Sequence, residues 1–223
     1  CLTDDHSIRT MTILCRMENK PVKPSIRPAS AKPRKRTAEA RAQLDPERWV
    51  DEAIDVLASE GVTGLRVEVL AKRCGVTKGS FYWHFKDRQA LLDAVLEQWK
   101  IGRIRDIEKT TSVSAGHESQ QLHYAIEVYG ASRNRKGMSI ELAVRDWARH
   151  DPRAAAIVEE VDLYRLQCTQ KLFVASGMSD AEAKSRSLLL YACVFGLSLM
   201  HYTHFDDNLA DLKKRIAERI IAS

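Results

Sequence analysis

Apolar residues recur at helical spacing in the long segments of this chain. Between Asp45 and Gly61 they occupy one face of a predicted amphipathic helix: Trp49, Val50, Ala53, Ile54, Leu57 and Ala58. Asp45 suits the N-cap, and Pro46 suits the first helical position because a proline lacks the N–H that would be unpaired there. Gly61 is expected to end this helix in the left-handed region.

Two short helices are predicted next, over residues 67–74 and from Thr77 to about Phe85, with a turn at residues 75–77 between them. Asp87 is expected to cap a longer fourth helix. That helix buries one face: Leu91, Leu92, Val95, Leu96 and Trp99. A loop is expected over residues 112–116.

The C-terminal half also shows helical periodicity. Helices are expected at about 118–132 and 139–149. A third is opened by Asp151-Pro152 and stopped by Gly177, and it carries Ile157, Val161, Tyr164, Cys168 and Leu172.

A capping box over residues 179–182 starts an apolar helix that is expected to run to about Phe205. The last helix carries one stripe: Leu209, Leu212, Ile216 and Ile220. No segment alternates with the period of a strand, so the predicted fold class is all-α, with a group of three helices near the N-terminus, whose helix-turn-helix character rests on the motif described below, and a C-terminal helical domain.

Charge is concentrated near the N-terminus. The chain has 223 residues, a net charge of +5 and 44% hydrophobic residues. Residues 20–41 hold eight basic side chains, one acid and four prolines. Residues 1–42 are therefore predicted to form a disordered basic arm. Contact with phosphates is one interpretation, and a solubilising tail or sequence ahead of the true start is the other.

The five cysteines form no pair with metal-ligand spacing, and their odd number fits buried thiols in a reducing cytosol. No signal peptide is evident, and the apolar run from Leu188 to Met200 is shorter than the roughly 20 residues that a membrane span requires. We expect a cytoplasmic protein without a membrane partner.

One motif points to function. A helix-turn-helix requires a small residue where its helices approach, a glycine for the turn and an apolar residue that holds the second helix in place. Ala71, Gly75 and Phe81 have these properties at suitable spacing. An amphipathic helix precedes them, and an aromatic cluster follows.

Four segments then occur in an order typical of one family: Gly61–Leu65, Leu70-Ala71, Gly75–Phe85 and Lys86–Leu92. On these residues, 43–103 resemble the DNA-binding domain of the TetR family of transcriptional regulators. The resemblance implies that the helix from Thr77 enters the major groove. It assigns DNA contacts to Arg66, Thr77, Lys78, Gly79, Ser80, Tyr82, Trp83, His84 and Lys86.

These positions also have structural interpretations. Phe81 and Phe85 are expected in the core, Tyr82 and Trp83 are alternatively half-packed aromatics, and His84 is alternatively structural. Two further positions, Lys78 and Ser80, fit no core pattern, so solvent or DNA are their expected partners. Arg66 stands where many family members have Ser or Thr, and an arginine cannot cap the second helix as a hydroxyl does.

Residues 104–223 would form the regulatory and dimerisation domain that the resemblance implies. The helix from Ser179 is apolar on nearly all sides and offers small residues at Ala192, Gly196 and Ser198. It is expected to build a four-helix interface with the last helix and a second copy, and the alternative is the core of a monomer. Effector-lining candidates, which are alternatively plain core, are His123, Tyr124, Met138, Trp147, Tyr164, Cys168 and Phe173.

The predicted function is a homodimeric regulator, most readily a repressor, that binds a palindromic DNA operator and is released by a small-molecule effector. No cofactor or metal is expected, and His201 with His204 lacks a third ligand. An activator, a ligand-independent regulator and a helical protein-interaction module are the alternatives. No nucleophile–base spacing, phosphate loop or carboxylate pair indicates an enzyme.

Overall fold

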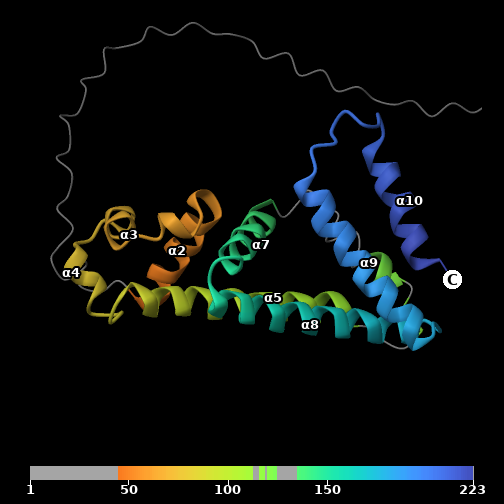
Figure 1. Ribbon diagram of the computed structural model, residues 1–223, viewed down its shortest axis with the longest axis horizontal. Helices are drawn as coiled ribbons and strands as arrows, with labels where there is room; N and C mark the ends of the chain where they lie inside the picture. Colours follow the sequence, from red (N-terminus) through yellow and green to blue (C-terminus); the bar gives the residue numbers. More distant parts are fainter. Residues whose placement is uncertain (1–44, 113–115, 119, 125–134, 223) are drawn as a thin grey trace, which may run out of the picture. The chain divides into compact units, whose positions relative to one another are not determined.

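In the computed structural model, residues 45–112, 116–118, 120–124 and 135–222 are described. The predicted basic arm and residues 125–132 of a predicted helix lie outside them. The described chain is helical and contains no strand, as expected for an all-α fold (Figure 1). Its elements are α2 (Pro46–Glu60), the 3₁₀ turn η1 (Val62–Gly64), α3 (Val67–Cys74), α4 (Lys78–Phe81), α5 (Arg88–Thr111), α7 (Arg135–Ala148), α8 (Pro152–Ala175), α9 (Asp180–Leu199) and α10 (Leu209–Ile221). None of these helices has the length and apolarity needed to cross a bilayer.

The predicted helix starts are confirmed by their caps. Asp45 accepts from the backbone N–H of Glu47 at 3.3 Å, and Asp87 accepts from that of Ala90 at 2.8 Å. In the C-terminal half, the side chains of Asp151 and Ser179 accept backbone N–H groups in the same way at the N-termini of α8 and α9. Each cap satisfies a backbone donor that the first helical turn leaves without a partner.

Three predicted boundaries were wrong. α4 ends at Phe81 rather than about Phe85, and residues 82–84 form a turn in which the Phe81 carbonyl accepts from the backbone N–H groups of His84 and Phe85 at 3.0 Å. α7 begins at residue 135 rather than 139, where Lys136 pairs with Asp55 of α2 at 2.6 Å. α9 ends at Leu199 instead of about Phe205. Phe205 is exposed, so no burial of its side chain would stabilise a longer helix.

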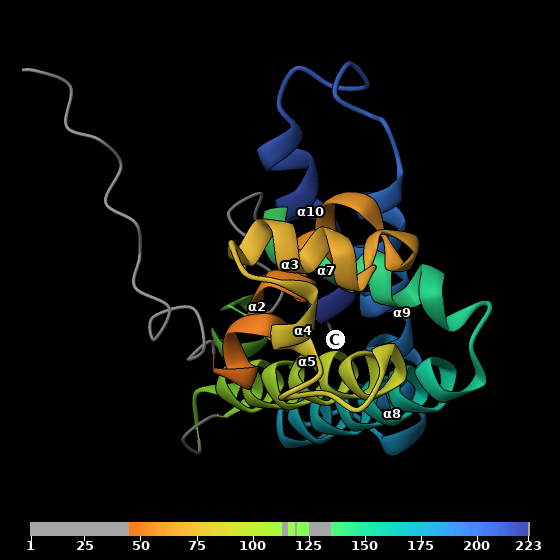
Figure 2. The same ribbon diagram turned by 90° about the vertical axis from the view of Figure 1, so that its left-hand side faces the viewer.

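One apolar core joins the N-terminal helices to α7 and α8. Its buried residues include Trp49 of α2, Phe81 of α4, Trp147 of α7 and Val161 of α8. α5 and α8 run side by side beneath this core (Figures 1 and 2). The short helices α3 and α4 are therefore held on a support that extends well beyond their own segment.

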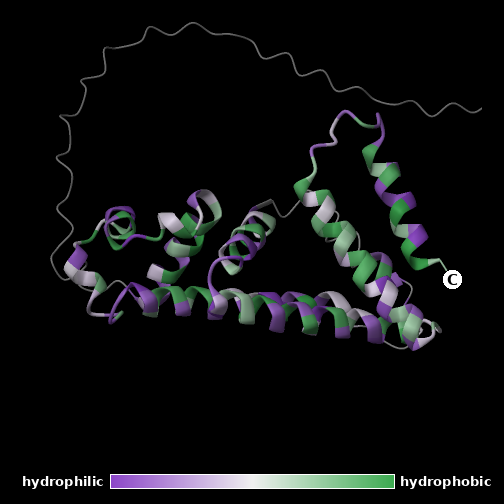
Figure 3. Ribbon diagram, viewed as in Figure 1, coloured by the Kyte–Doolittle hydropathy of each residue, from purple (hydrophilic) through white to green (hydrophobic). Residues whose placement is uncertain are grey.

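A second apolar cluster lies where the end of α8 meets α9 and α10. It contains Phe173, Leu190 and Ile220. The hydropathy colouring shows that α9 is apolar along much of its length, whereas α5 and α8 alternate between apolar and polar positions (Figure 3). Leu188 and Leu189 of α9 are 62% and 55% exposed, so this cluster covers only part of the apolar surface of α9.

Two glycines allow a test of the backbone conformation. Gly75 has φ of 69°, and Gly102 lies inside α5; no atom lies within 4 Å of a Cβ added at either position. Gly75→Ala is expected to lower the free energy of unfolding by about 1–2 kcal/mol through left-handed strain alone. Gly102→Ala should raise it by about 0.5–1 kcal/mol. Urea unfolding at one fixed protein concentration measures both, and equal shifts for the two variants would contradict this account.

Candidate functional site

The bend between α3 and α4 has the geometry that the sequence predicts. Gly75 adopts φ 69° and ψ 30°, the left-handed conformation, and its N–H and that of Val76 donate to carbonyls at the end of α3. Ala71 is buried at the crossing, as expected from its small side chain. The turn therefore closes α3 and redirects the chain into α4 without a Cβ clash.

Phe81 holds α4 in place. Its side chain is fully buried, with its ring centroid 5.4 Å from that of Trp49 in an edge-to-face arrangement. The ring of Phe85 stacks on the same side chain at 5.4 Å. Burial of Phe81 and Phe85 in the core is confirmed. A helix of four residues cannot be stable alone, so this anchoring makes α4 a defined element.

Aromatic side chains stand exposed directly after that anchor. Trp83 is 87% exposed and Tyr82 is 57% exposed, although the Tyr82 ring still touches the edge of Phe81 at 5.2 Å between centroids. The alternative of half-packed aromatics therefore fails for Trp83. An almost fully exposed tryptophan next to an exposed tyrosine is typical of a surface that receives a partner.

Two neighbouring positions differ from their expected environment. Ser80 is only 8% exposed, so the prediction that it faces solvent or DNA was wrong in this structure; its place beside Phe81 in a one-turn helix covers its small side chain. Lys78 is exposed, but its ammonium pairs with the carboxylate of Glu68 on α3, a partner that the sequence analysis did not foresee. The hydrogen bond with Glu68 raises the pKa of Lys78.

The remaining predicted contacts surround this surface. Arg66, Thr77, Gly79 and Lys86 are exposed, and neither Arg66 nor Thr77 makes a side-chain capping bond at the helix that follows it. The absence of a cap from Arg66 is as expected. His84 is half-buried, and its Nε2 is buried without a hydrogen-bond partner. The DNA-contact roles of these residues stay predictions.

Two arginines stabilise the helix-turn-helix region through contacts that the sequence analysis did not predict. Arg88 donates to the carbonyls of Leu65 at 2.6 Å and Val62 at 3.1 Å, which ties the first turn of α5 to η1. Arg73 of α3 pairs with Glu52 at 3.2 Å and Glu60 at 2.9 Å on α2. These partners lie at least 13 residues away in sequence, where helical periodicity carries no information.

The predicted effector residues do not gather around one described cavity. Tyr164 and Cys168 line a shallow hollow between α5 and α8, together with Glu108, Thr111, Ser112, Lys171, Leu172 and Ala175. Trp147 and Phe173 are buried in the core, Met138 packs against the second cluster, and His123 and Tyr124 are exposed. In the hollow, a hydrogen bond of 2.9 Å to Glu108 raises the pKa of Tyr164 to about 12.

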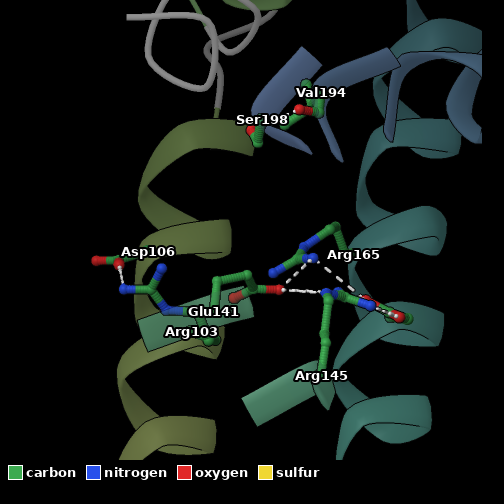
Figure 4. Close-up of polar contacts among 8 residues, drawn as sticks. Arg103, Asp106, Glu141, Arg145, Arg165, Val194 and Ser198 are labelled. Atoms are coloured by element: carbon green, nitrogen blue, oxygen red, sulfur yellow. Dashed lines mark hydrogen bonds and ion pairs between the residues drawn. The ribbon is translucent and has the colours of Figure 1, made fainter. Parts of the chain in front are cut away.

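A buried charge cluster links α7 and α8 to α9. Arg165 donates to Glu141 at 3.1 Å, and both side chains are almost fully buried. Arg145 also donates to Glu141, and it forms a two-bond contact with Asp162 at 2.6 and 2.8 Å (Figure 4). Its guanidinium lies 4.0 Å from the ring centroid of Phe195. Oε2 of Glu141 and Nε of Arg165 remain buried without partners.

This charge cluster holds no evident metal site. Within the described ranges, no group of three His, Cys, Asp or Glu side chains lies close enough together to bind an ion. Burial lowers the pKa of Arg145, but the hydrogen bond to Asp162 and the charge of Glu141 outweigh it and leave that pKa raised. The cluster is therefore an internal set of balanced charges.

A bend of this geometry, with an anchored second helix and exposed aromatic and basic side chains, defines a helix-turn-helix protein. Residues 50–95 match the model of the bacterial regulatory proteins of the tetR family. The match spans most of α2, all of η1, α3 and α4, and the first part of α5, so the similarity to this family lies in the helix-turn-helix segment.

Known proteins resemble the chain over different lengths. Tetracycline repressor protein class A from transposon 1721 of Escherichia coli is 44% identical over 55 residues, which is 25% of this chain and 26% of that protein. The chain therefore matches about a quarter of that relative's length.

Solved structures extend the likeness to the C-terminal helices. A transcriptional regulator from Rhodococcus sp. Rha1 has a TM-score of 0.65 at 22% identity, covering 80% of this chain and 94% of that one. A protein from Saccharomonospora viridis, solved in complex with choline, has a TM-score of 0.65 at 16% identity, covering 79% and 94%. At these identities the likeness shows a shared fold.

Removing the buried acid tests the charge cluster. Glu141→Gln leaves Arg165 with a buried charge and one fewer carboxylate, so it should lower the free energy of unfolding by about 3–5 kcal/mol. Lys184→Ala removes the partner of Asp180 in an exposed pair on α9 and should cost at most about 0.5 kcal/mol. Thermal and urea unfolding give both values. Similar losses in the two variants would show that the buried pair is no more important than the exposed one.

Proposed function

We propose that this chain is a sequence-specific DNA-binding regulator of transcription that inserts α4 and the turn after it into the major groove. The supporting observation is the exposed pair Tyr82 and Trp83, held by the buried anchor Phe81 within a family-matched helix-turn-helix. Such a surface offers stacking, apolar contact and hydrogen bonding at one place. This role would place the protein in the cytoplasm with the nucleoid.

Charge around this surface supports contact with the DNA backbone. Lys86 and Arg66 are exposed on either side of the helix-turn-helix sequence, and neither has an ion-pair partner among the described residues. Cations of this kind bind phosphates and supply affinity that falls with salt, whereas base-edge contacts supply specificity. The basic residues between 20 and 41 would add to this salt-dependent affinity for phosphates.

The decisive experiment selects bound DNA from a random pool with the full chain at fixed salt, followed by titration on the enriched site. Tyr82→Ala and Trp83→Ala should each weaken binding to that site by about tenfold or more, because each removes a base-edge contact. Both positions are exposed, so unfolding free energies should move by less than about 0.5 kcal/mol.

Tyr124→Ala, which removes an exposed aromatic side chain elsewhere, is the matched control and should leave the affinity unchanged. Enrichment of no sequence by the parent chain would refute the proposed function.

We further propose that the chain acts as a homodimer through α9 and α10. Four large apolar side chains are exposed on or next to α9: Leu188, Leu189, Leu199 and Met200. Their contact with water would be unfavourable in a monomer. Pairing α9 and α10 with those of a second copy would form a four-helix interface and cover this surface. Two recognition helices roughly 34–36 Å apart would then read a palindromic site.

Charge placed on α9 tests the interface. Leu189→Glu should shift the protein from dimer to monomer in analytical ultracentrifugation and weaken binding to a palindrome far more than to a half-site, because a buried carboxylate would oppose association. Leu163→Glu alters a side chain of similar exposure on α8 and should leave the dimer intact. A monomeric parent chain, or dissociation by both variants alike, would refute the proposed interface.

The proposed mode of action is repression that a small molecule relieves. The hollow at Tyr164 and Cys168, and the fold shared with a protein solved with choline, support a ligand in the C-terminal region. A ligand that favours one helix arrangement would change the spacing of the recognition helices. A reporter behind the selected site gives the sign: output should fall when the protein is expressed, and a rise would instead identify an activator.

A further inference from the structure

The ion pair between Lys78 and Glu68 lies on the surface proposed to meet DNA. Lys78 is the first residue of α4, and Glu68 lies in the first turn of α3, so the pair bridges the two helices of the helix-turn-helix. The side chains are 53% and 60% exposed, which leaves both accessible to a partner. Tyr82, one of the two exposed aromatic side chains, lies four residues after Lys78 and close enough to contribute to its electrostatics.

The fold does not need this pair. An exposed ion pair contributes little to stability, and α3 and α4 are already joined through Ala71, Gly75 and Phe81. A carboxylate is also a poor neighbour for a phosphate, because it repels the anion and offsets the charge of the lysine. Glu68 therefore argues against Lys78 as a simple phosphate anchor.

The pair matches the chemistry of one base-pair edge. In the major groove a G·C pair presents the acceptors O6 and N7 of guanine beside the N4 amino donor of cytosine. An ammonium donates to the first two, and a carboxylate accepts from the third. A thymine would instead place its methyl group against these charges, which would desolvate them without a hydrogen bond in return.

We propose that Lys78 and Glu68 act as one reading unit for a G·C base pair, with Lys78 on guanine and Glu68 on cytosine. The inference rests on the proposed DNA-binding function and adds the base pair that the surface selects. On binding, the ion pair opens only far enough for each group to reach its base. Glu68 becomes a specificity-determining residue on α3.

The test compares base preference at each position of the site that the parent chain selects. Both Glu68→Met and Lys78→Met, which remove the acceptor and the donor respectively, should reduce the preference for G·C over A·T, by about fivefold or more, at the same position of each half-site. The double variant should lose little more than either single one, because the two groups work together. Lys78→Arg should retain the guanine preference, since arginine also donates to O6 and N7.

Lys136→Met and Asp55→Asn form the matched control, because they disrupt another exposed lysine–carboxylate pair between helices. They should leave base preference unchanged. Unaltered base preference in the Glu68 and Lys78 variants would overturn the inference, as would an A·T pair at the affected position. Uniform loss of affinity for Lys78→Met, with the salt slope reduced by about one, would make Lys78 a phosphate anchor instead.

A failure of the parent chain to select any sequence refutes the proposed function itself. That result is distinct from a parent chain that selects a site while its Glu68 variant keeps the same base preference. Circular dichroism of Glu68→Met should match the parent, because the pair is exposed and the core does not depend on it.

Discussion

The placement of α4 depends on one packing interaction, the edge-to-face contact between Phe81 and Trp49. A four-residue helix has no stability of its own, and the side chains that follow it on the surface take their position from this buried ring. Gly75 makes the turn that brings the chain to that contact, and the ring of Phe85 stacks on that of Phe81. Exposed aromatics at Tyr82 and Trp83 can be tolerated because the residue just before them is so firmly buried.

Features set by neighbouring residues were predicted well. Asp45, Asp87 and Asp151 were recognised as caps, and the left-handed Gly75 was recognised as the turn, because a cap or turn is decided within three or four residues. The end of α9 was not predicted, since it depends on where the core stops rather than on propensity.

Polar contacts between distant segments could not be predicted from periodicity. The sequence shows that Glu141, Arg145 and Arg165 are charged, but it gives no sign that all three meet inside the protein. The ion pair between Lys78 and Glu68 and the burial of Ser80 were not predicted for the same reason. Apolar periodicity identifies the buried face of each helix, and the partner across that face is decided by tertiary packing.

α7 forms ion pairs with both α2 and α8. Near its start, Lys136 pairs with Asp55 of α2, while Glu141 and Arg145 bind the charged residues of α8. The same 14-residue helix therefore contributes to the packing of α2, on which Phe81 rests, and to the buried charge cluster of α8. The N-terminal helices and the C-terminal charge cluster thus share one structural element rather than being joined only through the chain.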